Sequence, residues 1–370
     1  MRVLFVATGL GIGGAEKQIL DLAEALIKKG HSVKVACITG DCAYPLSNEV
    51  QKSLCYLNAN KSPISLLNAL FKLSTIIRQF MPDAVHSHMV HANIFSRIVR
   101  LFTKTPVLIS SAHNQNEGGK LRMLAYRVTN NLSDLTTNVS EQAALSFIEK
   151  KAVPKDQIKV FYNGINTDLF HYCKESRSSL RNELRISQDD QMLLAVGRLT
   201  EAKDYPNMLR AIKLLIEKNN KLKLFIAGQG ELSDSLNTLV EELNLTENVT
   251  FLGVRHDINC LMSAADCFVL SSEWEGLPLV IGEAMACELP VVVTNAGGSR
   301  EFVNDNGFVV PIQNADALAA GIQSVLDMPE QERKVLGNNA RNYIVNHFSL
   351  DAVADKWIDL YRNLNFQNKN

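Results

Sequence analysis

Short apolar segments alternate with longer amphipathic segments along almost the whole chain. The short segments are continuously apolar, which is typical of strands buried on both faces, and the longer ones repeat apolar positions every three or four residues, as helices do. We expect strands at residues 2–8, 32–39, 84–86, 107–110, 135–139, 159–161, 192–196, 223–227, 249–252, 267–270 and 290–294. We expect helices at residues 15–29, 63–80, 92–102, 206–219, 232–243, 315–327, 329–348 and 349–364, and helices that begin at Ser140 and near Pro278.

Two such arrays follow one another. Repetition of strand and helix predicts a parallel sheet with helices on both faces, and the pattern restarts at Met192. The predicted fold class is therefore α/β, with two Rossmann-like parallel-sheet domains facing a cleft. Residues 168–188 are polar and weakly patterned, so we expect the linker there or just before. This predicts domains at residues 1–167 and 168–348, followed by a last helix within residues 349–370.

Composition places the chain among soluble globular proteins. Hydrophobic residues make up 46% and charged residues 21% of the 370 residues, and no apolar run approaches the roughly 18 to 20 residues of a membrane span. The apolar part of the N-terminal stretch is too short for a signal peptide. Seven cysteines form no C-x-x-C pair and mostly lie in apolar segments, so we expect reduced core thiols in a cytosolic protein.

Charge is unevenly distributed although the net charge is only −1. Residues 1–170 hold 19 Lys and Arg against 12 Asp and Glu, and the remainder is acidic. This asymmetry favours an anionic partner for the first half, although chance variation between two domains explains it about equally well. Nucleic-acid binding is not supported, because the basic residues are dispersed and the sequence pI is 6.7.

The segment from Cys267 to Cys287 is the most informative for chemistry. A buried strand is followed by Glu275, by Pro278 at an expected helix start, and by Glu283 within that helix. The free N–H groups of a first helical turn favour an anion, and proline is well placed in that turn. Two carboxylates beside an anion site indicate a phosphorylated, hydroxyl-rich ligand.

A glycine-rich turn, residues 9–14, follows the first strand and satisfies G-x-G-x-x-G. The dinucleotide fingerprint also needs an acidic residue about 20 residues later, and the nearest candidate, Asp41, lies 27 residues after Gly14. A nicotinamide or flavin site is therefore disfavoured. We expect instead a flexible turn whose N–H groups face the cleft, with Gly13 and Gly14 closest to the helix; a plain tight turn is the alternative.

A second turn brings two cations to the end of a strand. Gly197 is followed by Arg198 and, five residues on, by Lys203. Arginine offers a fork that matches phosphate oxygens and lysine a point charge, and no Asp-x-Asp motif occurs anywhere in the chain. These cations are therefore candidates to replace the metal ion that an Asp-x-Asp motif would hold, and we expect no metal. Gly228 and Gly230 follow a third strand, where they predict either another close approach of the backbone to a ligand or simply a turn before a helix.

Histidines gather in the first half. His86, His88 and His91 lie near one strand end, but their spacing does not suit neighbouring metal ligands. His113 follows the next strand and is a candidate for the cleft. No G-x-S-x-G motif, Walker A sequence or internal repeat is present.

These residues together resemble a known family. Glu275-Gly276-Leu277-Pro278 with Glu283 is similar to the E-x7-E motif of retaining glycosyltransferases of family 4, which have the GT-B fold. The resemblance covers nearly the whole chain, and the last helix is similar to the family's crossover helix, which returns to the first domain. Other family-like segments, in the family's order, are Gly13-Gly14-Ala15-Glu16, Asn163-Gly164-Ile165-Asn166, Gly197-Arg198 with Lys203, Gly228-Gln229-Gly230, and Gly297-Gly298 with Glu301. One departure is Asn166, where the family usually has aspartate.

The resemblance implies a role for each candidate residue. Arg198 and Lys203 would hold the diphosphate of a nucleotide sugar. Glu283 would bind the ribose hydroxyls and Glu275 the transferred sugar. The remaining implied donor or acceptor contacts are Gly13, Gly14, Gly228, Gly230, Gly276, the N–H groups of Leu277 and Leu279, His113 at the sugar or acceptor, and Arg255 beside the base.

The resulting expectation is a metal-independent, retaining hexosyl- or N-acetylhexosaminyltransferase with no cofactor. The donor is a nucleotide diphosphate sugar, with UDP favoured over GDP, and the resemblance implies front-face attack with the leaving phosphate as base. The alternatives are a non-catalytic nucleotide-sugar-binding subunit and an NAD-dependent oxidoreductase.

The acceptor side of the expectation comes from the basic first half. Basic residues interleaved with Leu, Ile and Phe suit an anionic membrane surface. We therefore expect a lipid-linked saccharide acceptor, as in surface polysaccharide assembly, and attachment at the inner face of the cytoplasmic membrane. The basic residues are Lys72, Arg78, Arg97, Arg100, Lys104, Lys120, Arg122 and Arg127.

Overall fold

The computed structural model describes residues 1–11, 13–115, 117–187, 189–217 and 219–368. It consists of two compact units, and each is described by itself. Unit 1 contains Met1–Gly164 and Leu350–Asn370, and unit 2 contains Ile165–Ser349. The chain thus passes into unit 2 just before the polar stretch 168–188, and that stretch holds a helix of unit 2, α7 (Lys174–Glu183).

Unit 1 is built on a parallel sheet of seven strands among the described residues, in the order β3-β2-β1-β4-β5-β6-β7. The carboxyl ends of all these strands lie at one edge, which is where open parallel sheets bind ligands. The strands are β1 (Arg2–Ala7), β2 (Ser32–Cys37), β3 (Leu54–Tyr56), β4 (Ala84–His88), β5 (Leu108–Ala112), β6 (Leu135–Asn138) and β7 (Ile158–Val160).

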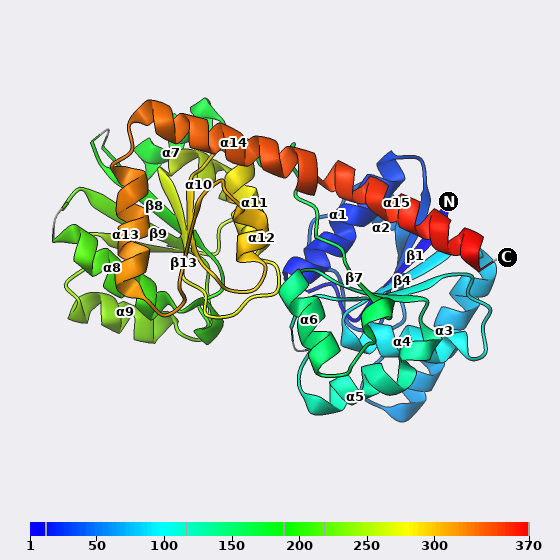
Figure 1. Cartoon of the computed structure of the whole chain (residues 1–370). Helices are drawn as coiled ribbons and strands as arrows, with labels where there is room; N and C mark the ends of the chain where they lie inside the picture. The colour runs from blue at the N-terminus through cyan, green and yellow to red at the C-terminus, as the bar shows by residue number, and fades with distance from the viewer. Residues whose placement is uncertain (12, 116, 188, 218, 369–370) are drawn as a thin grey trace. The chain divides into compact units, whose positions relative to one another are not determined.

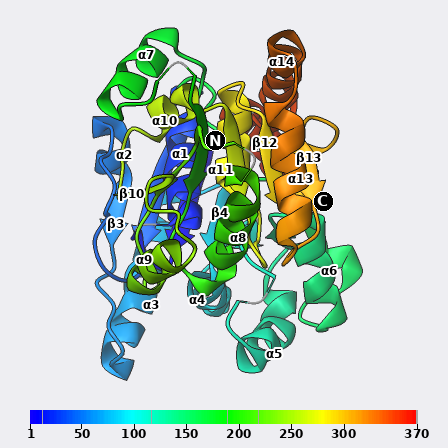
Figure 2. The ribbon, with the colours of Figure 1, turned by 90° about the vertical axis from the view of Figure 1, so that its left-hand side faces the viewer.

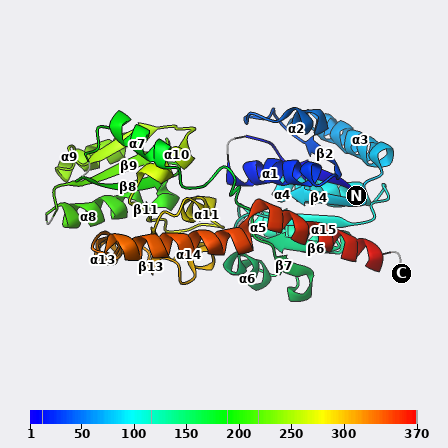
Figure 3. The same ribbon diagram turned by 90° about the horizontal axis from the view of Figure 1, so that it is seen from above.

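Helices cover both faces of this sheet. Phe5 of β1 belongs to a core shared with α1 and α15, whereas its neighbour Leu4 points into a core shared with α3 and α4, as the alternation of side chains along a strand requires. Figures 1 and 3 show α15 alongside α1. The helices of unit 1 are α1 (Gly14–Lys28), α2 (Asn48–Ser53), α3 (Pro63–Phe80), α4 (Val90–Arg100), α5 (Lys120–Thr129), α6 (Glu141–Glu149) and α15 (Leu350–Gln367).

Unit 2 repeats the plan with six parallel strands in its described part, in the order β10-β9-β8-β11-β12-β13. Its strands are β8 (Gln191–Val196), β9 (Leu222–Ala227), β10 (Val249–Gly253), β11 (Cys267–Leu270), β12 (Val291–Thr294) and β13 (Phe308–Val310). One face carries α8 (Tyr205–Ile216), α9 (Ser233–Glu242) and α13 (Ala315–Leu326), and Figure 2 shows α8 and α13 next to each other. The remaining helices are α7, α10 (Ile258–Ala264), α11 (Leu279–Ala286), α12 (Ser299–Val303) and α14 (Glu330–Phe348).

The C-terminal helix returns to unit 1, as the family resemblance implied. Helix α14 packs on α11 of unit 2, and the chain then leaves unit 2 at Ser349. Trp357 and Tyr361 of α15 are buried in the core with β1 and α1. The hydroxyl of Tyr361 lies 2.7 Å from Nδ1 of the buried His86, so one of the histidines considered above joins the sheet to α15.

The expectation for the cysteines needs correction here. The seven cysteines are all free thiols, but only Cys37, Cys267 and Cys287 are buried; the other four are half-buried. Within the part of the chain that the structure describes, no helix has both the length and the apolar character needed to cross a bilayer.

Candidate functional site

Glycine turns at the carboxyl edge of the unit 2 sheet pack directly on one another. A Cβ atom at Gly228 would lie 1.9 Å from the carbonyl oxygen of Gly197. Gly228 also has a φ of 150°, a backbone conformation that favours glycine. A Cβ atom at Gly230 would lie 2.3 Å from the carbonyl oxygen of Leu199. The turns after β8 and β9 therefore meet only because these positions carry no side chain.

The turn after β12 meets the turn after β11 in the same way. Gly297 has a φ of 55°, and a Cβ atom there would lie 2.4 Å from the carbonyl oxygen of Glu275. The N–H group of Gly298 donates a 2.8 Å hydrogen bond to the carbonyl of Gly276. Four neighbouring strand ends thus supply one continuous backbone surface at this edge.

Lys203 and Glu275 form an ion pair on that surface. Their Nζ and Oε1 atoms are 2.5 Å apart, and the two side chains are only 16% and 14% exposed. The hydroxyl of Ser272 donates to the same carboxylate oxygen at 2.7 Å. Lys203 is held in place through its backbone, because Ser271 donates to its carbonyl oxygen at 2.8 Å. The ammonium and carboxylate therefore occupy fixed positions between the turns after β8 and β11.

Arg198 lies on the same turn as Lys203 but is exposed. Its guanidinium has no hydrogen bond or ion pair to the described residues, so its five N–H donors are available to an anion. The sequence correctly predicted both cations at this strand end. It did not predict that one of them is already paired with a carboxylate.

The helix expected near Pro278 is α11, and it begins one residue later than expected. Pro278 is the residue before the first helical one, with a φ of −75° and a ψ of 93°. Leu277 is 8% exposed, and Gly282 packs so closely that a Cβ atom would lie 2.9 Å from Ile165. Glu283 lies in the second turn, where it is half-buried and already engaged with neighbouring groups.

Arg255 is engaged elsewhere. Its guanidinium forms two hydrogen bonds with the carboxylate of Asp257, at 2.8 and 2.6 Å, and an ion pair with Glu183 at 3.2 Å. These carboxylates raise the pKa of Arg255 above its usual value. The backbone of its turn lies close to the glycine turns, since Gly228 donates to the carbonyl of Gly253 at 2.8 Å. Contact of the Arg255 side chain with a ligand requires these pairs to break.

The first glycine turn of unit 1 differs from the expectation. The N–H of Gly13 donates to the hydroxyl of Tyr44, which in turn donates to the carbonyl of Gly13, both at 2.9 Å. The Gly13 N–H is therefore satisfied within the unit rather than free for a ligand. Gly14 is exposed and begins α1. Ile12, inside this turn, lies outside the described residues.

Three buried histidines lie together in unit 1, His86 and His88 on β4 and His113 directly after β5. His88 Nδ1 and His113 Nε2 are joined by a 3.1 Å hydrogen bond, and the rings of His86 and His88 are in contact, with centroids 4.0 Å apart and planes tilted by 36°. Burial lowers the pKa of His113 to about 4. The other ring nitrogens of His88 and His113 are buried without a partner among the described residues. Burial therefore favours the neutral imidazole of His113.

Two residues that shape these sites were missed. Glu117 is 7% exposed, and its carboxylate accepts from the N–H groups of Val90 and His113, both at 2.9 Å. Ser272 orients Glu275, as described above. The sequence signal for Ser272 was available, because it lies two residues after β11 and three residues before Glu275. No pattern marks Glu117, since its partners are backbone groups.

Two of the basic residues expected at a membrane surface form hydrogen bonds or ion pairs within unit 1 instead. Arg97 is fully buried and bonds to Ser110 at 3.1 Å and Thr136 at 3.0 Å. Arg100 is paired with Asp134 at 2.8 Å. The other six, Lys72, Arg78, Lys104, Lys120, Arg122 and Arg127, are exposed. Within the described ranges, no group of three His, Cys, Asp or Glu side chains is arranged to hold a metal ion.

Comparison with known proteins relates this chain to glycosyltransferases. Residues 176–343 match the family described as glycosyl transferases group 1, and residues 12–169 match glycosyltransferase family 4. An uncharacterized glycosyltransferase of Methanocaldococcus jannaschii is 30% identical over 95% of this chain and 94% of its own length. The UDP-Gal:α-D-GlcNAc-diphosphoundecaprenol α-1,3-galactosyltransferase of Escherichia coli is 28% identical over 82% of this chain and 81% of its own length.

A solved structure extends the likeness to the whole fold. The crystal structure of the Anabaena protein HepE in complex with UDP superimposes with a TM-score of 0.84, at 21% sequence identity, over 98% of this chain and 100% of that one. Each unit, the two parallel sheets and the returning C-terminal helix are all included in that coverage. The chain therefore belongs to the group 1, family 4 glycosyltransferases and has the GT-B fold.

Proposed function

We propose that this enzyme transfers a hexose or N-acetylhexosamine, with retention of configuration, from a UDP-sugar to a lipid-linked saccharide in surface polysaccharide synthesis. The observation that carries the proposal is the fixed Lys203–Glu275 pair beside the start of α11. Two of the relatives support the choice of substrates, since one binds UDP in its crystal structure and the other is named for a UDP-sugar donor and a diphosphoundecaprenol-linked acceptor.

Unit 2 is the proposed donor-binding unit. Arg198 and Lys203 bind the diphosphate, together with the N–H groups of Leu277 and Leu279 at the start of α11. Glu283 accepts hydrogen bonds from the ribose, and Glu275 from the transferred sugar. The glycine turns at Gly228, Gly230 and Gly276 support this assignment, because they expose backbone where a bulky ligand needs close approach.

The charge arrangement suits departure of a nucleoside diphosphate. As the glycosidic bond to the phosphate breaks, negative charge grows on the phosphate oxygens. Cations and N–H groups that are already fixed there stabilise this charge without reorganising, which is usually a dominant contribution to catalysis. Glu275 holds the ammonium of Lys203 in position before the donor arrives, and Arg198 supplies an unpaired second cation.

Retention is proposed to proceed by front-face attack, with the leaving phosphate accepting the proton of the acceptor hydroxyl. The carboxylate of Glu275 is bound by Lys203 and by Ser272, which suits a group that orients hydroxyls rather than a free nucleophile. A glycosyl adduct trapped on any Asp or Glu of this chain would contradict this part of the proposal.

Unit 1 is the proposed acceptor and membrane-binding unit. Its α5 exposes Leu121, Leu124 and Val128 at 82%, 52% and 71%, and these residues recur on one face of the helix. Basic residues flank that face, and residues 118–133 include no acidic one. An apolar face bordered by cations is typical of helices that lie on anionic membranes, which supports attachment at the cytoplasmic face of the membrane.

The experiment that tests the proposal is nucleotide release. The purified protein is incubated with a panel of UDP-, GDP- and ADP-sugars, with and without extracted lipid-linked acceptors. We expect release with a UDP-sugar, stimulated by acceptor and strongly reduced in Lys203→Ala and Glu283→Ala. Equal release in both variants and in the wild type would refute the site assignment. Absence of release with every donor would favour a non-catalytic binding subunit.

A further inference from the structure

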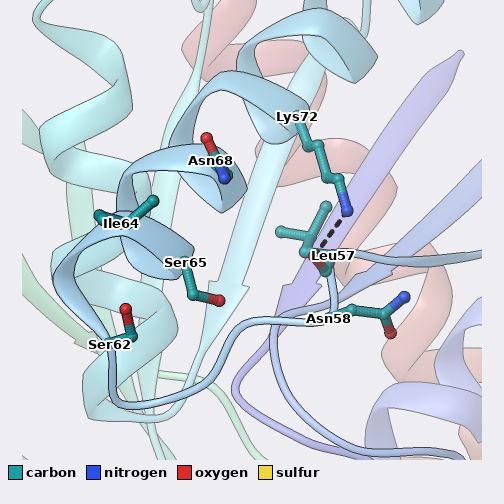
Figure 4. Close-up of a pocket in the computed structure, with 7 residues that line it drawn as sticks. All are labelled: Leu57, Asn58, Ser62, Ile64, Ser65, Asn68 and Lys72. Carbon is teal, nitrogen blue, oxygen red and sulfur yellow. Dashed lines mark hydrogen bonds between the residues drawn. The ribbon is translucent and has the colours of Figure 1, made fainter.

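A polar pocket opens on unit 1 between α3 and the loop that follows β3. It has a volume of about 530 Å³ and is drawn in Figure 4. Its polar lining comes from Asn58 on the loop and from Ser62, Ser65, Asn68 and Lys72 on or next to α3. No part of the donor site described above lies in it, since all of those residues belong to unit 2.

The walls of the pocket are already in place. Leu57 donates from its N–H to the carbonyl of Cys37 at 2.9 Å, and Ala59 donates to that of Ile38 at 2.8 Å. These bonds fix the loop to the end of β2. Asn60 donates from its N–H to the hydroxyl of Ser65 at 3.0 Å, which ties the same loop to α3. A ligand would therefore meet a formed cavity.

The lining chemistry favours a hydroxylated, negatively charged group. Lys72 donates one hydrogen bond, at 3.1 Å, to the carbonyl of Leu57, and an ammonium has three N–H donors. Asn58 and Asn68 add amide donors and acceptors, which are the usual partners of sugar hydroxyls. Residues 57–82 include no Asp or Glu, so nothing in the pocket repels phosphate.

An exposed apolar stripe lies immediately beside the pocket. Ile64, Leu67 and Phe71 are 72%, 52% and 59% exposed and recur on one face of α3, one residue out of step with Ser65, Asn68 and Lys72. Adjacent residues of a helix lie about 100° apart around its axis, so the polar and apolar stripes are neighbours. Phe71 continues the stripe onto Phe102, at a ring distance of 6.3 Å.

We propose that this pocket binds the phosphosaccharide head group of the acceptor, while the adjoining stripe contacts its lipid. The inference rests on the proposed function, which needs an amphiphilic acceptor, and adds the site that recognises it. An amphiphile with a sugar phosphate next to a hydrocarbon chain matches a polar pocket next to an apolar stripe. A lone phosphate or a free sugar would use only the pocket.

The test compares the double variant Asn68→Ala/Lys72→Ala with Lys155→Ala, a control that removes one exposed cation of the same unit outside the pocket. With a lipid-linked acceptor, we expect the acceptor KM of the double variant to rise about tenfold to a hundredfold, as expected for lost bonds to a charged group. The donor KM, and nucleotide release without acceptor, should stay at wild-type values. An unchanged acceptor KM, or an equal rise in Lys155→Ala, overturns the proposal.

A direct binding measurement separates this proposal from the proposed function. Hexose 1-phosphate is titrated into the full chain and followed by saturation-transfer NMR. We expect binding to the wild type and to Lys155→Ala but not to the double variant, whether or not any donor is turned over. Equal binding of hexose 1-phosphate by all three proteins overturns the proposed binding role of the pocket, even if sugar transfer is observed. If the pocket binds hexose 1-phosphate as expected but no sugar is transferred, the result counts against the proposed function alone.

Discussion

The Nζ atom of Lys203 lies 2.5 Å from Oε1 of Glu275, on the surface where the turns after β8 and β11 meet. Ser272 donates to the same oxygen at 2.7 Å. The pair joins two residues that are 72 positions apart in the chain. In the proposed donor complex the ammonium faces phosphate and the carboxylate faces sugar, so the two halves of the pair should be separable by experiment.

Measurements of UDP binding should distinguish the role of Lys203 from that of Glu275. Lys203→Ala is expected to weaken UDP binding by about tenfold or more, because a hydrogen bond between charged groups is lost. Glu275→Gln keeps the shape of the side chain and frees the ammonium, so UDP should bind as tightly as to the wild type or more tightly, while turnover falls about a hundredfold. Calorimetry and initial rates measure the two effects. Lys334→Ala, an exposed cation of α14, is the control, and unchanged UDP affinity in Lys203→Ala would contradict the assignment.

Close packing of the glycine turns predicts a stability difference between two alanine variants of unit 2. Gly253 has a φ of 66° but no atom near an added Cβ, whereas at Gly228 the Cβ would meet the carbonyl oxygen of Gly197. Gly253→Ala should cost about 1 kcal/mol for its backbone conformation. Gly228→Ala should cost about 1–3 kcal/mol more, because neighbouring backbone must move.

Urea unfolding in a Trp357→Phe background measures this difference. Only two tryptophans are present, and Trp274 then reports on unit 2 alone. Equal free energies of unfolding for the two alanine variants would show that the turns relax without cost. The close packing of Gly228 on Gly197 would then not support the assignment of the site.

Acid should destabilise unit 1 through its buried histidines. Burial lowers the pKa of His113 to about 4, from 6.5 for an exposed histidine. Between these values the unfolded chain binds more protons than the folded one. The stabilisation is therefore complete above pH 6.5 and is lost as pH falls toward 4, by up to about 1.4 kcal/mol per pH unit.

The His113→Gln variant should remove this contribution. Its free energy of unfolding should fall less steeply than that of the wild type between pH 6.5 and 5. Trp357 fluorescence in a Trp274→Phe background measures it for unit 1, and His256→Gln, an exposed histidine of unit 2, is the control. Parallel pH profiles for wild type and His113→Gln would show that His113 is not held neutral by burial.

Association with anionic vesicles should depend on α5. Each basic residue near an anionic membrane contributes about 1 kcal/mol, so Lys120→Glu combined with Arg127→Glu should weaken binding at least tenfold at low salt. Cosedimentation with phosphatidylglycerol vesicles measures the binding, and high salt should reduce it for the wild type. Lys221→Glu combined with Lys334→Glu, at two exposed lysines of unit 2, is the matched charge reversal. Equal vesicle binding by the α5 double variant and the wild type would contradict the membrane assignment.

Segments with strong local signals were predicted well from sequence. The helix at 63–80 and the strand at 267–270 have the expected bounds, because a proline begins the first and a continuous apolar run defines the second. Short elements were missed, among them β3, β13 and α12. Three to five residues carry too little periodicity, and pairing with a neighbouring strand decides such segments.

In the candidate site, too, local sequence signals were predictable and contacts between distant segments were not. Arg198, Lys203, Glu275 and Glu283 were found from motif and position, and the structure places them around two adjoining turns and α11. Contacts between distant segments could not be foreseen. Arg97 was expected at a membrane surface because it is one of the basic residues interleaved with Leu, Ile and Phe, but hydroxyl groups from β5 and β6 accept its hydrogen bonds inside unit 1. Likewise, the pairing of Arg255 with Glu183 depends on α7, which the sequence did not predict.

Transfer of a labelled sugar from a UDP-sugar to a lipid-linked saccharide tests the central claim most directly. The organic-phase product is quantified for the wild type, Lys203→Ala and the control Lys334→Ala, and its anomeric configuration is read by NMR. We predict an α-linked product from an α-linked donor, formed at wild-type rates by Lys334→Ala and at least a hundredfold more slowly by Lys203→Ala. A β-linked product, or undiminished transfer by Lys203→Ala, would contradict the account.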